Sequence, residues 1–247
     1  MRLFGLIGYP LSHSFSEKYF TEKFKREKIT GARYMLFPLK DINDFDLLVR
    51  RSNFSGMNVT VPFKIDIMKH LDEIDQDALV AGAVNTIRFY KNNDKLITKG
   101  YNTDIFGFEK LLEKFTLPHN TKALILGTGG GSKAAAYVLK KRNIPFSFVS
   151  RNPVDAEIFS YQSLTEEIIS GHQLIINTTP LGMFPEIEKF PDIPYSYISP
   201  GHFCIDLIYN PGMTAFLMKC EHRKAAVLNG MEMLSEQAEQ SWKIWNL

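Results

Sequence analysis

The stretch KALILGTGGGSKAAAYVLKKRN, residues 122–143, decides the fold of this 247-residue chain. It reads as a buried strand, a turn rich in glycine and an alanine-rich helix. Such a turn lets the backbone approach a pyrophosphate, whose charge is met by the free N–H groups at the start of the helix. A tight strand-to-helix turn without a ligand also uses glycine. The stretch therefore predicts a Rossmann-type unit and leaves both explanations of its glycines open.

Strand and helix patterns alternate on either side of this stretch, which is typical of an α/β protein with mainly parallel strands. Ahead of it we expect strands at residues 3–8, 33–39 and 56–61, and helices at residues 16–28, 41–51 and 62–71. VNTIRFY and KLITKGY flank an Asn-Asn-Asp turn and predict a hairpin. A helix-like stretch starting near residue 102 then opens a second strand-helix series, so we place a domain boundary there.

Composition excludes several classes of function. Basic and acidic residues, 29 and 27, are scattered without a basic block, so we expect neither nucleic acid nor membrane as a partner. No stretch approaches the roughly 18 apolar residues of a membrane span. Cys204 and Cys220 indicate reduced, buried thiols in a cytoplasmic protein. The six histidines show no metal-ligand spacing, so no metal site is expected.

The strand that follows the glycine-rich helix indicates the cofactor. PFSFV, residues 145–149, runs into Ser150 and Arg151, where an NAD site usually offers an acidic residue to the ribose diol. A cation suits a 2′-phosphate instead, so NADP is preferred over NAD. A solvated loop arginine is the alternative interpretation of Arg151.

Lys64, at the end of NVTVPFK, is a candidate proton donor. Proline favours the first position of a helix, so Pro62 places Lys64 in an expected first turn. The helix dipole there disfavours the charged amine, which predicts a lowered pKa and an amine able to exchange a proton. Taken alone, the residue reads more simply as a surface lysine on a short helix.

Other polar residues would form a catalytic or binding site only if the fold brings them together. Asp104 starts a helix and reads by default as a capping carboxylate, but beside Lys64 it would complete an acid-base pair. Short hydroxyl and amide groups could bind a polyhydroxylated acid, although they also cap helices and shape turns. These groups are Ser12, Ser14, Ser16, Asn58, Thr60 and Asn85.

Taken together, the motifs resemble shikimate dehydrogenases from end to end. The matching pieces are GYPLSHSFS (8–16), NVTVPFK (58–64), AGAVNT (81–86), YNTDIFGF (101–108), GTGGGSKAA (127–135), NTTPLGM (177–183), DLIYNP (206–211) and GMEMLSEQA (230–238). The resemblance implies a substrate and catalytic domain, residues 1–102 with 231–247, and an NADP-binding Rossmann domain, residues 103–230. It also implies NADPH-dependent reduction of 3-dehydroshikimate to shikimate in aromatic amino acid biosynthesis.

The resemblance also implies roles for individual residues. Substrate contacts fall on Ser14, Ser16, Thr60, Asn85, Tyr209 and Gln237 with Asn58 as a neighbour, and the catalytic pair on Lys64 and Asp104. Cofactor contacts fall on Gly127, Thr128, Gly129, Gly130, Gly131, Ser150, Arg151, Asn152, Leu207 and Gly230. NADP-selective members often carry a second basic residue where this chain reads NPVDA, so the strictness of the preference stays open.

Two rival interpretations remain at this point. A quinate or quinate/shikimate dehydrogenase would differ in specificity at the substrate residues, and the missing acidic residue after PFSFV disfavours its NAD-using form. A ligand sensor would keep the fold without turnover, which intact Lys64 and Asp104 disfavour. Monomer and homodimer are equally compatible with the sequence.

Overall fold

The computed structural model describes residues 1–11, 14–154 and 158–247. This described chain divides into two compact units, Met1–Thr103 with Ala238–Leu247 (unit 1) and Asp104–Gln237 (unit 2). Residues 231–237, which we expected with unit 1, are part of unit 2. A Cβ added to Gly107 would lie 2.4 Å from the Met233 carbonyl oxygen, so this segment packs tightly against the helix that carries Gly107.

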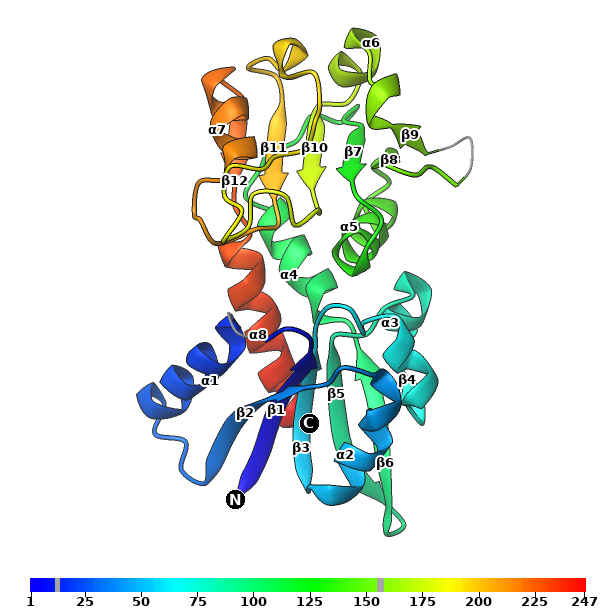
Figure 1. Ribbon diagram of the computed structural model, residues 1–247, viewed down its shortest axis with the longest axis vertical. Helices are drawn as coiled ribbons and strands as arrows, with labels where there is room; N and C mark the ends of the chain where they lie inside the picture. The colour runs from blue at the N-terminus through cyan, green and yellow to red at the C-terminus, as the bar shows by residue number, and fades with distance from the viewer. Residues whose placement is uncertain (12–13, 155–157) are drawn as a thin grey trace. The chain divides into compact units, whose positions relative to one another are not determined.

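Unit 1 is built on a mixed sheet, in which the described strands follow the order β2-β1-β3-β5-β6-β4 (Figure 1). The strands are β1 (Arg2–Gly8), β2 (Ala32–Pro38), β3 (Phe54–Val59), β4 (Glu73–Ile74), β5 (Thr86–Asn92) and β6 (Lys95–Tyr101). β1 pairs in parallel with β2 and β3, and β4 with β6, whereas β5 is antiparallel to both of its neighbours. The helical segments are α1 (Phe15–Arg26), η1 (Ile42–Asp44), α2 (Phe45–Arg51), η2 (Asp66–His70) and α3 (Gln76–Ala81).

The expected hairpin is confirmed, whereas of the helix expected at residues 62–71 only Asp66–His70 is helical, as the short 3-10 helix η2. Asn93 and Asp94 have φ of 48° and 62° between β5 and β6, the left-handed conformation that a tight hairpin turn requires. Residues 61–65 instead form a turn that precedes η2. The Lys64 carbonyl accepts a hydrogen bond from the Val84 N–H at 2.7 Å, so a tertiary contact replaces a helical one.

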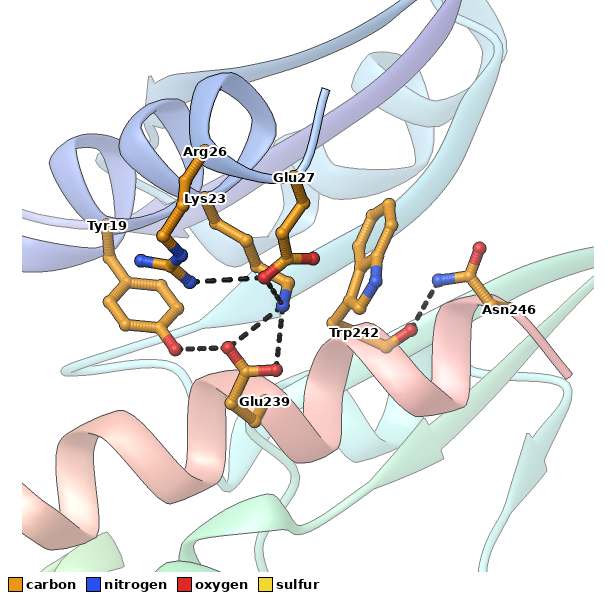
Figure 2. A network of polar contacts seen from close by, with 7 residues as sticks. All are labelled: Tyr19, Lys23, Arg26, Glu27, Glu239, Trp242 and Asn246. Carbon is orange, nitrogen blue, oxygen red and sulfur yellow. Dashed lines mark hydrogen bonds and ion pairs between the residues drawn. The ribbon is translucent and has the colours of Figure 1, made fainter. Parts of the chain in front are cut away.

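The last helix, α8 (Met231–Trp245), closes the core of unit 1 with its C-terminal half. The Trp245 ring stacks 4.9 Å from the Phe4 ring, and its indole N–H donates to the Ile87 carbonyl at 3.0 Å. Gly56 is required opposite, because a Cβ there would lie 2.3 Å from the indole. Glu239 of the same helix bonds to α1 through Lys23 (Figure 2).

Unit 2 carries a parallel sheet, whose described strands follow the order β12-β11-β10-β7-β8-β9. The strands are β7 (Ala123–Leu126), β8 (Phe146–Ser150), β9 (Phe159–Ser160), β10 (Leu174–Asn177), β11 (Phe203–Asp206) and β12 (Ala226–Leu228). The helical segments are α4 (Thr103–Leu112), α5 (Gly130–Lys141), η3 (Tyr161–Ser163), α6 (Glu166–Ser170), η4 (Tyr195–Tyr197) and α7 (Ala215–His222). This is the doubly wound order of dinucleotide-binding sheets, and it reverses between β7 and β10. No helix in the described ranges is long and apolar enough to cross a bilayer.

Candidate functional site

The glycine loop lies at the point where the strand order of unit 2 reverses. Gly127, directly after β7, has φ of +107°, and a Cβ there would lie 2.8 Å from the Thr178 hydroxyl after β10. Glycine is therefore needed both for the backbone conformation and for the approach of the two strand ends. Ligands of open α/β sheets bind at such a reversal, outside the carboxyl ends of the strands.

The start of α5 can receive an anion. Gly129 is its N-cap, and a Cβ added there would meet nothing within 4 Å. The first turn, which includes Gly130 and Gly131, contains no acidic residue. Ser132 donates its hydroxyl hydrogen to the Gly129 carbonyl at 2.6 Å. No side-chain hydrogen bond caps this helix at its N-cap, and the first N–H groups of a helix have no partner within the helix. These features, with exposed Thr128 between the glycines, suit a pyrophosphate.

The predicted 2′-phosphate residues lie at the end of β8. Ser150 ends this strand and accepts a hydrogen bond from the Asn152 N–H at 3.2 Å, and Arg151 is exposed. Burial raises the pKa of Tyr161, and the positive charge of Arg151 opposes that shift. The rest of NPVDA extends into residues 155–157, which lie outside the described part of the chain.

Leu207 and Gly230 lie together at the carboxyl end of β11. A Cβ on Gly230 would fall 2.1 Å from the Leu207 carbonyl oxygen, and the Gly230 N–H donates to the Ile208 carbonyl at 3.0 Å. Tyr209 follows on the same loop, half-buried, and burial raises its pKa. The predicted nicotinamide-proximal residues are therefore adjacent within unit 2.

Asp206, which sequence reasoning did not single out, anchors this loop. Its carboxylate is buried and accepts hydrogen bonds from Asn177 Nδ2 at 3.1 Å, the Ile208 N–H at 3.0 Å and the Thr214 hydroxyl at 2.6 Å. Burial raises its pKa to about 6, and the three donors oppose that shift. The sequence did contain a signal for this role, since Asp206 is an acidic residue at the end of an apolar strand. A carboxylate that is buried there requires hydrogen-bond partners.

Lys64 and Asp104 belong to different compact units. Lys64 lies half-buried in the turn at residues 61–65, so the helix-dipole argument made for it loses its premise. Asp104 is the second residue of α4, which agrees with the expected position at the start of a helix. Its side chain is buried. Their action as a pair stays a prediction.

Ser14 and Ser16 lie at the start of α1. Ser14 is the N-cap residue but makes no capping hydrogen bond, and its buried Oγ has no hydrogen-bond partner among the described residues. A buried hydroxyl without a partner is costly, so this oxygen suits a ligand. Ser16 bonds to the Tyr34 hydroxyl, whose pKa is raised chiefly by burial. Ser12, from the same predicted cluster, lies outside the described residues.

Asn58 has a structural role that its sequence position did not indicate. Its Oδ1 accepts from the Tyr34 hydroxyl at 2.8 Å, and its Nδ2 contacts Thr86 and Ser241, each at 3.1 Å. These hydrogen bonds are internal to unit 1, and a substrate contact by Asn58 stays a prediction. Thr60, half-buried just after β3, donates its N–H to the Ile7 carbonyl at 2.9 Å.

Asn85 and Gln237 are both buried. Asn85 Oδ1 accepts from the Thr103 N–H at 2.7 Å, at the start of α4. Gln237, on the part of α8 counted with unit 2, donates to the Leu234 carbonyl at 3.0 Å. The structure thus gathers Ser14, Ser16, Thr60, Lys64 and Asn85 in unit 1, and the cofactor residues with Asp104, Tyr209 and Gln237 in unit 2. Within the described ranges, no group of three His, Cys, Asp or Glu residues could hold a metal ion.

Comparisons with known proteins agree with this architecture. Residues 6–87 match the family model of the shikimate dehydrogenase substrate binding domain. A shikimate dehydrogenase (NADP(+)) of Methanococcus maripaludis is 40% identical over 260 residues, which cover 99% of this chain and 91% of that protein.

Solved structures agree as well. Shikimate dehydrogenase 1 of Peptoclostridium difficile superposes with a TM-score of 0.87 at 36% identity, covering 100% of this chain and 92% of that one. Shikimate 5-dehydrogenase of Thermus thermophilus, solved in complex with NADP(H) and shikimate, superposes with a TM-score of 0.84 at 27% identity, covering 99% of this chain and 93% of that one.

Proposed function

This chain belongs to the shikimate dehydrogenase family, and from that membership we propose that it catalyses the reversible, NADP-dependent reduction of 3-dehydroshikimate to shikimate. One observation carries the proposal: the glycine loop lies at the strand-order reversal of unit 2, where its geometry suits a dinucleotide. The relatives' names and the ligands of the Thermus thermophilus structure support the choice of substrate and cofactor.

Unit 2 is the proposed cofactor domain. The first N–H groups of α5 meet the pyrophosphate, with glycine at positions 127 and 129–131 allowing its approach. Arg151, with Ser150 and Asn152, binds the 2′-phosphate. Leu207 and Gly230 lie beside the nicotinamide, on the loop that Asp206 anchors.

Unit 1 is the proposed substrate domain. Ser14, whose Oγ is buried without a partner in the described chain, binds the substrate together with Ser16, Thr60 and Asn85. Tyr209 and Gln237 complete the contacts to the hydroxylated ring. Short hydroxyl and amide groups suit this substrate because each can both orient and satisfy a ring hydroxyl or a carboxylate oxygen.

Bound NADPH supplies the hydride to the ketone carbon. In the proposed mechanism, Lys64 donates a proton to the ketone oxygen, which becomes the new hydroxyl of shikimate. Asp104 orients the ammonium group of Lys64 and balances its charge. In the reverse direction the neutral amine of Lys64 accepts the hydroxyl proton.

The test is a turnover assay on the purified protein with shikimate and either NADP⁺ or NAD⁺, followed by nicotinamide absorbance. We expect reduction with NADP⁺, and loss of kcat by roughly 10²- to 10⁴-fold in Lys64→Ala and Asp104→Asn. A folded protein that binds shikimate without reducing either cofactor would be a sensor. Faster turnover of quinate than of shikimate would instead identify a quinate dehydrogenase.

The proposal includes a cytoplasmic location and no nucleic-acid or membrane partner. Two buried free thiols, Cys204 and Cys220, support the location, because reducing compartments keep thiols unoxidised. Scattered charge with a net value of +2 supports the absence of polyanionic partners. Both monomer and homodimer fit the proposal.

A further inference from the structure

Buried polar side chains from distant parts of the sequence meet inside unit 1. We call them the hydroxyl network. Each is at most 5% exposed, and they come from β3, from β5 and the residue before it, from the start of α4 and from the C-terminal half of α8. The members are Asn58, Asn85, Thr86, Thr103 and Ser241.

Ser241 connects the last helix to this network. Its Oγ lies 2.8 Å from Thr86 Oγ1 and 3.1 Å from Thr103 Oγ1, and it accepts from Asn58 Nδ2 at 3.1 Å. Replacing it by alanine would leave these groups short of a partner in a site that excludes water, where an unmet hydrogen bond is costly. Ser241 therefore has more influence on the network than its small side chain suggests.

The network determines how the Asn85 amide is turned. The Thr103 N–H can only donate, so the atom that it meets at 2.7 Å must be the Asn85 oxygen. The hydroxyls of Thr103 and Thr86 contact the same oxygen at 3.1 and 3.2 Å. The amino group of Asn85 is consequently directed away from the network, and the same bonds hold the first turn of α4, which carries Asp104.

We propose that Ser241 is a positioning residue for catalysis. Through Thr86 and Thr103 it sets the orientation of the Asn85 amide and the position of the helix start that bears Asp104. It acts on the reaction only through these residues. The proposal rests on the proposed function, because that function assigns the roles of Asn85 and Asp104. The contacts of Ser241 with Thr86 and Thr103 do not depend on it.

The experiment compares Ser241→Ala with two controls on the same helix. Ser235→Ala removes a hydroxyl whose one hydrogen bond within the described residues is local, to the Met231 carbonyl at 3.1 Å. Ile244→Val trims a buried side chain outside the network and lowers the melting temperature by a few degrees. We expect kcat/KM to fall about tenfold in Ser241→Ala, mostly in kcat, and to stay within about twofold in both controls.

Hydrogen exchange provides a readout that does not depend on activity. Ser241→Ala should speed exchange of the backbone amides of residues 103–107, and Ser235→Ala should not. A wild type without turnover of shikimate would refute the proposed function, while the exchange rates would still decide whether Ser241 holds this helix start. Unchanged exchange in Ser241→Ala would overturn the positioning role.

Equal losses of kcat/KM in Ser241→Ala and Ile244→Val would also overturn the proposal, because general loosening of α8 would then explain both. If Ser241→Ala does not fold, Thr103→Val and Thr103→Ser provide the test. Valine keeps the shape and removes the hydroxyl, whereas serine keeps the hydroxyl. We expect loss of kcat/KM in Thr103→Val with recovery in Thr103→Ser, and equal activity of the two would contradict the proposal.

Discussion

At the scale of single residues, unit 2 contains a carboxylate whose negative charge is destabilised by burial. Asp206 is buried, and its hydrogen bonds come from neutral donors rather than from a cation. Burial raises its pKa to about 6, above the ordinary value of 3.8. Between these two values the folded state binds more protons than the unfolded state, so this group makes the protein less stable as the pH rises.

This residue gives a testable pH dependence. Asp206→Asn removes the titrating group and keeps its shape, so the variant should gain stability relative to the wild type as the pH rises from about 4 to about 6. The full difference is on the order of 3 kcal/mol above pH 6, from about two units at roughly 1.4 kcal/mol each. Urea unfolding of both proteins at about pH 4.5 and about pH 7.5 measures it. A difference that does not change with pH would contradict the shifted pKa.

At the scale of secondary-structure elements, α8 is tied to α1 by a buried lysine (Figure 2). The Lys23 side chain is only 4% exposed, and its ammonium contacts Glu27 and Glu239, each at 2.8 Å. The Tyr19 hydroxyl donates to Glu239, and burial, followed by this bond, raises the pKa of Tyr19. Glu239 is a third exposed, so the two sides of the ion pair differ in how well water reaches them.

That difference predicts an asymmetry between two substitutions. Glu239→Ala leaves a buried ammonium with one partner fewer and should lower the free energy of unfolding by roughly 1–3 kcal/mol. Lys23→Met leaves a carboxylate that water can reach, so its cost should be smaller. Urea unfolding compares them, with Glu186→Ala in an exposed pair as the control, expected to change stability by less than about 1 kcal/mol. A larger cost for Lys23→Met would refute this account.

At the scale of the whole molecule, the chain offers separate probes for its two units. Both tryptophans, Trp242 and Trp245, belong to unit 1, whereas the proposed NADP site belongs to unit 2. The helices α4 and α8 each contribute residues to both units. Because a helix forms cooperatively, we expect the two units to unfold together.

We predict that NADP⁺ raises the midpoint of unfolding by the same amount whether unfolding is followed by tryptophan fluorescence or by far-ultraviolet circular dichroism. At a ligand concentration of about 100 times Kd the gain is roughly 2.7 kcal/mol. Gly127→Val is the control, because its side chain would strain a backbone with φ of +107° and remove the effect. A midpoint that moves by circular dichroism but not by tryptophan fluorescence would show that the units unfold separately.

Local patterns were sufficient for much of the fold. The β7-glycine-α5 unit and the β5-β6 hairpin follow the expected segments, because each depends on residues close together in the sequence. The turn at residues 61–65 did not follow its pattern, since the Lys64 carbonyl bonds to Val84 instead of continuing a helix. The family was likewise predictable, because its motifs lie along the chain in order.

The sequence by itself determined the Rossmann unit, the family and the positions proposed for Lys64, Asp104 and the phosphate loop. Only the tertiary structure decided that Asn58 is occupied by internal hydrogen bonds, that Asp206 anchors the Leu207 loop, and that Ser241 reaches the start of α4. The physical reason is that a glycine turn or a helix is specified by neighbours in the chain. A buried hydrogen bond is specified by partners that only folding brings within about 3 Å of each other.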